Sequence, residues 1–166
     1  MPHTPSVDRH AIAAFRRFYS LLPRSEDASL VVLKLHLLVE EQIRAFVAER
    51  LVHPDALKAA KLTFHQASYL AQALSHEEID SRIWDAAIKL NELRNDVAHQ
   101  LDPPGAMQRM ENICHQLGHH PQRRKGKKPE PLEDFSFAVS LIYNAISVHV
   151  KRQPAEVLTL VAPARE

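Results

Sequence analysis

The chain has 166 residues, of which 45% are hydrophobic and 25% charged, and its formal net charge is +1 at pH 7. This length fits one domain with its own core, and the composition is that of an ordinary soluble protein. Three glycines are too few for the turns of a β-rich fold, and the single cysteine, Cys114, excludes an intramolecular disulfide. No apolar run reaches the roughly 18 residues of a membrane span, and the N-terminus lacks the basic-then-apolar pattern of a signal peptide. We therefore expect a cytoplasmic protein without membrane contact.

The eleven prolines leave long runs with helical periodicity between them. The spacing of apolar residues predicts helices over residues 8–22, 26–51, 64–74, 107–117 and 132–152, and a short helix over 54–61. Ser75 and Glu78 fit a capping box, which predicts another helix from residue 75 to about 101. The run 26–51 is apolar around most of its circumference, so it is expected at the centre of the fold.

Together these elements predict an all-α fold, an antiparallel bundle of five to six helices. The helices at 26–51, 75–101 and 132–152 are expected to form its core. A single domain is expected over residues 1–152, with an N-terminal helix at 8–22 and a basic, proline-broken loop at 119–131. Residues 153–166 are expected to be a loosely ordered tail.

The predicted helix at 75–101 carries an unusual cation. Its apolar side chains gather on one stripe, and Arg94 projects from the middle of that stripe. A cation in such a place needs an acceptor. Glu40 lies on an apolar arc of the central helix, with Arg44 one turn later, so we expect Glu40 to pair with Arg94, with Arg44, or with both. Arg94 is then either part of a structural ion pair or the cationic half of a site.

Polar residues surround Arg94 near the end of the same helix, where Asn95, Asp96 and His99 lie on the far side from the apolar stripe. Metal-free RNA cleavage needs a group that takes the 2′-hydroxyl proton, a group that protonates the leaving oxygen, and a cation on the phosphorane. Histidine suits the first two roles and arginine the third. Asn95 or Asp96 would orient His99 or the phosphate. One copy of the chain supplies too few groups, whereas two copies at a symmetric interface supply two arginines and two histidines.

The segment Leu93-Arg94-Asn95-Asp96-Val97-Ala98-His99 resembles the Arg-(four to six residues)-His motif of HEPN domains, a superfamily of helical bundles. Residues 37–43 look like the first core helix of that superfamily, and residues 62–74 with the motif helix are similar to its mannitol-operon-repressor branch. The order of helices matches over about residues 26–152, and only the motif is residue-specific. The resemblance implies a dimeric, metal-independent endoribonuclease with Arg94 and His99 as catalytic residues and Asn95 as the accessory polar residue.

The expected function is therefore that of a HEPN-type protein acting on RNA in defence, in a toxin–antitoxin pair or in RNA turnover. RNA, a second copy of the chain and an antitoxin or regulatory protein are the expected partners, without a cofactor. HEPN toxins silenced by a nucleotidyltransferase antitoxin carry a tyrosine two residues after the histidine, where this chain has Leu101. That form of silencing is thus not expected. Two alternatives stay open: a non-catalytic regulator similar to the mannitol operon repressor, and a structural adaptor in which the motif only fixes helix register.

Two weaker signals lie towards the C-terminus. Positive charge clusters in the proline-broken loop at Arg123, Arg124, Lys125, Lys127 and Lys128. Such a cluster is either a solvated linker or a contact with the RNA backbone that carries no sequence preference. The possible metal ligands Cys114, His115, His119 and His120 match no familiar zinc spacing, so no metal site is expected.

Overall fold

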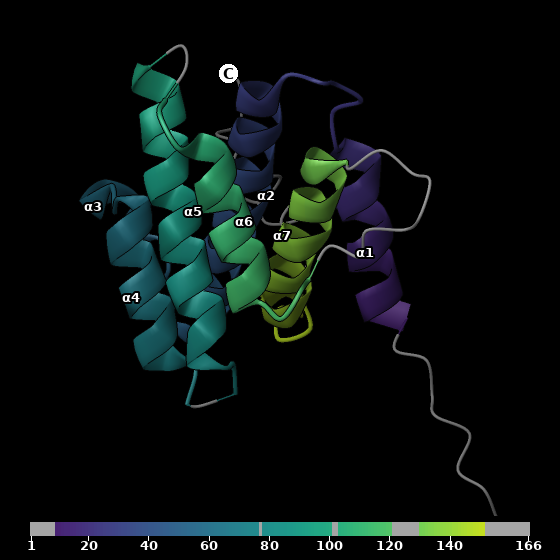
Figure 1. The fold of residues 1–166 in the computed structure, drawn as a ribbon. Helices are drawn as coiled ribbons and strands as arrows, with labels where there is room; N and C mark the ends of the chain where they lie inside the picture. Colours follow the sequence, from purple (N-terminus) through teal and green to yellow (C-terminus); the bar gives the residue numbers. More distant parts are fainter. Residues whose placement is uncertain (1–8, 77, 101–102, 121–129, 152–166) are drawn as a thin grey trace, which may run out of the picture.

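The computed structural model describes residues 9–76, 78–100, 103–120 and 130–151, and over these residues it contains seven helices and no strand (Figure 1). The helices are α1 (Arg9–Leu21), α2 (Ala28–Arg50), α3 (Ala56–Ala60), α4 (Phe64–Leu74), α5 (Ser81–His99), α6 (Ala106–Gln116) and α7 (Pro131–Ser147). The all-α prediction is confirmed. The described residues hold seven helices where five to six were expected, and one of the seven, α3, has only five residues.

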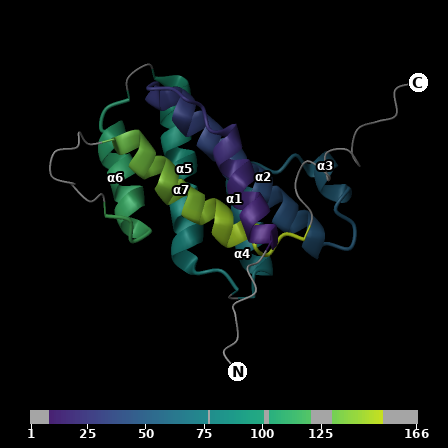
Figure 2. The same cartoon turned by 90° about the vertical axis from the view of Figure 1, so that its right-hand side faces the viewer.

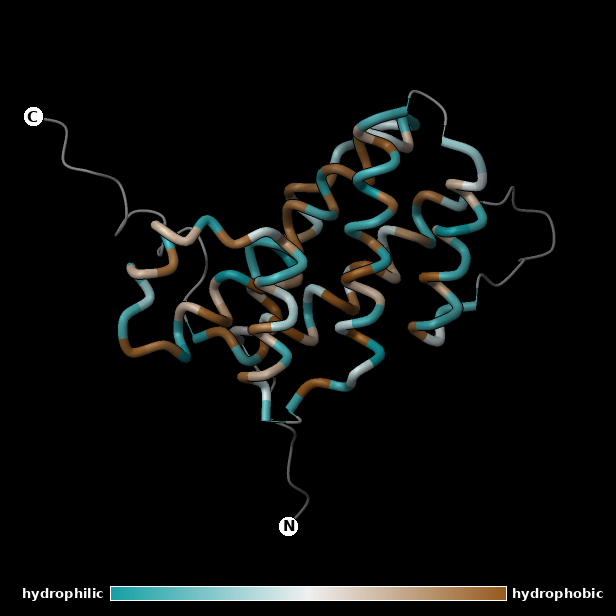
Figure 3. The backbone as a smooth tube through the Cα atoms, turned by 90° about the vertical axis from the view of Figure 1, so that its left-hand side faces the viewer, coloured by the Kyte–Doolittle hydropathy of each residue, from teal (hydrophilic) through white to brown (hydrophobic). Residues whose placement is uncertain are grey.

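α2 lies at the centre of the bundle, as its sequence predicts. It packs against α4 and α5 on one side and against α7 on another. α1 lies against α7 (Figure 2), and α6 covers α5 and α7. In Figure 3, hydrophobic and hydrophilic residues alternate along the outermost helices, as expected for helices with one face towards a core.

A buried and a half-buried polar contact tie the central helix to its neighbours on the α1–α7 side. Gln42 of α2 is fully buried, and its Nε2 donates to the hydroxyl of Tyr143 at 2.9 Å. Arg17 of α1 also donates to that hydroxyl, at 3.2 Å, and binds the Glu41 carboxylate at 2.8 Å. Because buried polar groups are costly when unpaired, these contacts fix how α1 and α7 sit on α2.

The start of α5 differs from the sequence prediction. The expected capping box at Ser75 and Glu78 is wrong, because Ser75 ends α4 and its hydroxyl donates to the Gln72 carbonyl at 2.8 Å. Glu78 instead binds Arg50 at 2.8 Å. α5 begins six residues later at Ser81, where Asp80 caps the helix by accepting from the Arg82 N–H at 2.9 Å.

A capping box does occur, at the start of α4. The Thr63 hydroxyl accepts from the Gln66 N–H at 3.3 Å, and the Gln66 side chain accepts from the Thr63 N–H at 3.0 Å. Further along the chain, α7 ends at Ser147 rather than at 152. Residues 121–129 of the predicted basic loop and the predicted tail at 153–166 lie outside the described residues. None of the helices described carries an apolar stretch of the length needed to cross a bilayer.

The capping box generates a stability prediction. Thr63→Ala removes the acceptor for the Gln66 N–H and should lower the free energy of unfolding by about 1 kcal/mol. Thr63→Ser keeps a hydroxyl in the same place and should retain most of that stability. Urea denaturation followed by circular dichroism measures both variants. An equal loss in the two would show that the hydroxyl contributes nothing as a cap.

Candidate functional site

The candidate residues occupy the last turns of α5, at one end of the bundle (Figure 1). The helix ends at His99, and Gln100 caps it by donating its N–H to the Asp96 carbonyl at 2.9 Å. Asn95 and His99 are exposed, whereas Arg94 and Asp96 are half-buried. Polar atoms of all four residues therefore lie near the surface at this end.

The helical position of Arg94 predicts a place inside the core stripe, but the structure shows the residue only half-buried. Leu90 and Leu93 are fully buried, but Val97 is only half-buried and Ala98 is exposed. Burial of the side chains thus decreases towards the end of α5, and Arg94 lies at the start of this less buried part of the helix. Its Nη1 donates to the Asn95 Oδ1 at 3.1 Å.

Glu40 pairs with Arg44 and not with Arg94. The Arg44 guanidinium donates to Glu40 Oε1 through Nη2 at 2.6 Å and Nε at 2.9 Å, and to the Leu62 carbonyl at 2.9 Å. No ion pair joins Glu40 to Arg94 in the described part of the chain. The ion pair lies within α2, so it does not fix the register of α5 on α2.

A polar contact between α2 and α5 is made by His36. His36 is only 3% exposed, and its Nε2 lies 3.0 Å from Asn91 Oδ1 on α5. An amide oxygen only accepts, so Nε2 carries the proton. The ring packs on Phe64 of α4, with 4.5 Å between centroids. His36 therefore joins α2, α4 and α5 at a single point.

The electrostatics of this junction extend to Arg94. Burial lowers the pKa of His36 from its usual value, while the Glu40 carboxylate, 3.7 Å from Nδ1, opposes the shift. The positive charges of Arg94 and Arg44 lower the His36 pKa further. Arg94 thus lies within electrostatic range of His36.

Asp96 has a different partner from the one proposed for it. Its carboxylate binds the guanidinium of Arg109 on α6, and Arg109 also donates to the Pro104 carbonyl at 2.9 Å. These contacts hold the start of α6 against the end of α5. Asp96 therefore joins two helices, and the structure does not bring its carboxylate to His99. Neither a hydrogen bond nor an ion pair joins His99 to another described side chain.

The other candidate groups contribute less. The basic residues Arg123, Arg124, Lys125, Lys127 and Lys128 lie outside the described residues. Cys114 is buried, which raises its pKa to about 11 and keeps the thiol protonated at neutral pH. His119 binds Asp134 at 3.1 Å. Within the described ranges, no three side chains of His, Cys, Asp or Glu gather as metal ligands would.

The His36 junction leads to a prediction about pH. Because the folded-state pKa of His36 lies below its unfolded value, the unfolded chain binds more protons between the two, and stability falls as the pH drops through this window. Glu40→Gln removes the charge that raises the His36 pKa and should lower that pKa further. NMR titration of the His36 imidazole in both proteins measures the effect. An unchanged or raised pKa in Glu40→Gln would contradict the described geometry.

Comparisons with known proteins do not extend this description. No family model, curated protein or solved structure matches the chain. A function for this end of α5 must accordingly be argued from its own residues and from the motif at residues 93–99.

Proposed function

We propose that this protein is a HEPN-type RNA-acting protein, a metal-independent endoribonuclease whose site combines Arg94 and His99 from two copies of the chain. The observation that supports this most strongly is the charge of Arg94. Of the half-buried arginines in the described residues, Arg17, Arg50 and Arg109 each bind a carboxylate. Among the described residues, Arg94 binds only the neutral amide oxygen of Asn95.

An uncompensated guanidinium at a half-buried position is suited to an anion. Its planar set of donors matches two phosphate oxygens, and partial burial strengthens the attraction relative to a fully solvated arginine. The contact with Asn95 holds one edge of the guanidinium near the surface. Arg94 is therefore the residue that we assign to the scissile phosphate.

His99 supplies the group that moves protons. It is exposed, and histidine exchanges protons near neutral pH. It follows Arg94 by five residues, which places it about 7.5 Å along the axis and about 140° around the helix. Arg94 and His99 of one chain thus face different sides, so a second copy must bring its histidine to the phosphate.

An exposed apolar strip beside this end of α5 supports the second copy. Leu30, Leu33 and Leu37 recur at helical spacing on one side of α2, and Leu30 and Leu37 are 40% and 56% exposed. α2 and α5 run antiparallel (Figure 1), and His36 contacts Asn91. The first turns of α2 consequently lie beside the last turns of α5. We call Leu30, Leu33 and Leu37 the α2 strip.

In the proposed reaction one His99 takes the proton of the ribose 2′-hydroxyl as that oxygen attacks the phosphorus. The other His99 protonates the leaving 5′-oxygen, and the two Arg94 side chains neutralise the charge of the phosphorane. The products carry a 2′,3′-cyclic phosphate and a 5′-hydroxyl. Asn95 positions Arg94, and no metal ion takes part.

The test is cleavage of RNA by the purified protein in the presence of a chelator. His99→Ala and Arg94→Ala should each lower the rate by roughly 100-fold or more, as expected for loss of a proton-transfer or charge-stabilising group. His53→Ala and Arg24→Ala change exposed residues elsewhere and should leave the rate unchanged. Arg94→Ala should melt close to the parent, because Arg94 has no carboxylate partner among the described residues.

Cleavage that persists in His99→Ala would reject the assignment of His99. A parent protein that cleaves no RNA under these conditions would reject the nuclease and favour a regulator similar to the mannitol operon repressor.

A further inference from the structure

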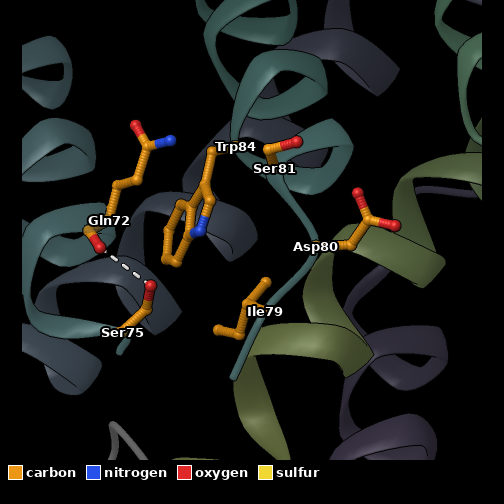
Figure 4. Close-up of a pocket in the computed structure, with 6 residues that line it drawn as sticks. All are labelled: Gln72, Ser75, Ile79, Asp80, Ser81 and Trp84. Carbon is orange, nitrogen blue, oxygen red and sulfur yellow. Dashed lines mark hydrogen bonds between the residues drawn. The ribbon is translucent and has the colours of Figure 1, made fainter. Parts of the chain in front are cut away.

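A cavity of about 390 Å³ lies at the opposite end of α5 from Arg94 (Figure 4). The described residues that line it are Gln72, Ser75, Ile79, Asp80, Ser81 and Trp84. They come from the end of α4, the connection into α5 and the first turn of α5. Trp84 precedes Arg94 by ten residues, or about 15 Å along the helix axis.

Trp84 leaves a hydrogen-bond donor without a partner in this cavity wall. The side chain is 1% exposed, and its Nε1 has no acceptor among the described residues. In Figure 4 the nitrogen edge of the indole faces the space between Ile79, Asp80 and Ser81. Buried indole N–H groups ordinarily have an acceptor, so an unpaired one on a cavity wall is a donor for an acceptor that enters the cavity.

The indole is held in this orientation by its other contacts. Phe46 of α2 packs edge-on against it, with 5.9 Å between ring centroids. Ala86 and Ala87 on the next turn of α5 are fully buried, so α5 cannot rotate to carry the N–H elsewhere without exposing core. An acceptor must therefore come to Trp84 from the cavity.

The charges around the cavity define what can enter it. Asp80 is the anionic member of the described lining, and none of the lining residues in the described ranges is cationic. Both Asp80 oxygens are occupied, since Arg82 donates to Oδ1 at 2.9 Å through its N–H and to Oδ2 at 2.7 Å through Nη2. A carboxylate or phosphate placed here would meet the negative charge of Asp80 and no cationic lining residue among those described. A neutral acceptor avoids that cost.

We propose that this cavity is a binding site for a small neutral molecule with a carbonyl oxygen, which accepts the Trp84 N–H while its apolar body packs against Ile79. The Ser81 hydroxyl belongs to the same cavity and offers a hydrogen bond to a polar group beside the carbonyl, whereas the Gln72 carboxamide lies on the other side of the indole (Figure 4). An amide, which places an N–H next to its oxygen, is the chemical class that uses both the indole N–H and the Ser81 hydroxyl.

The chain contains a single tryptophan, so one indole cross-peak in a ¹⁵N-correlation spectrum reports on this site. We would titrate the labelled protein with 2-pyrrolidinone, a small cyclic amide, and in parallel with butyrate and with pyrrolidine. The amide should move the Trp84 indole peak downfield and saturably, with an affinity in the millimolar range expected for so few atoms. Butyrate, an anion, and pyrrolidinium, a cation without an acceptor, should leave the peak in place.

A matched pair of variants controls the experiment. Ser81→Leu places bulk at the exposed rim of the cavity and should abolish the amide-induced shift, whereas Glu92→Ala, an exposed change further along α5, should keep it. Thermal melting checks that both variants fold. No shift with the amide, an equal shift with all three probes, or a full shift in folded Ser81→Leu would overturn the proposal.

Discussion

Enclosure of α2 by the other helices is the constraint on which the rest of the structure depends. A helix that is apolar on almost every side must be covered by neighbours, and a polar donor that it turns inward is stabilised by an acceptor on one of them. Gln42 Nε2 donates to the Tyr143 hydroxyl of α7, and His36 Nε2 donates to Asn91 of α5. These two pairs help to fix α7 and α5 against α2.

The same constraint determines where the candidate site lies. With His36 bound to Asn91, the last turns of α5 follow the first turns of α2, beyond the part of the bundle that α4 covers. Burial decreases there, Arg94 has no carboxylate partner among the described residues, and the α2 strip is exposed. We therefore attribute both the unpaired cation and the exposed leucines to one feature, a side of α2 that a single chain leaves uncovered.

Much of the architecture could be predicted from the sequence, because periodicity reports directly on burial. The apolar circumference of residues 26–51 identified the central helix, and the residues 64–74 of α4 were predicted as the structure has them. The start of α5 was missed because the Ser75–Glu78 spacing matches a capping box, although both side chains have other partners. Local spacing cannot distinguish a cap from a serine that ends the preceding helix.

The candidate site was harder to predict than the fold. A helical wheel places Arg94 on the core side of α5, but it does not show how far along the helix the core extends. The pairing of His36 with Asn91 depends on how two helices are rotated against each other, which neither helix encodes by itself. The same holds for Asp96, whose partner Arg109 lies on the next helix. These contacts follow from tertiary packing rather than from spacing.

The measurement that tests this account most directly is the molar mass of the protein in solution. Sedimentation equilibrium of the parent should give twice the 18.9 kDa chain mass. Leu37→Glu, which places a charge in the α2 strip, should give the monomer mass, whereas the same change at Val52, which is 87% exposed outside the strip, should leave the dimer intact. A monomeric parent, or a Leu37→Glu variant that stays dimeric, would contradict the claim that two copies meet at this end of α5.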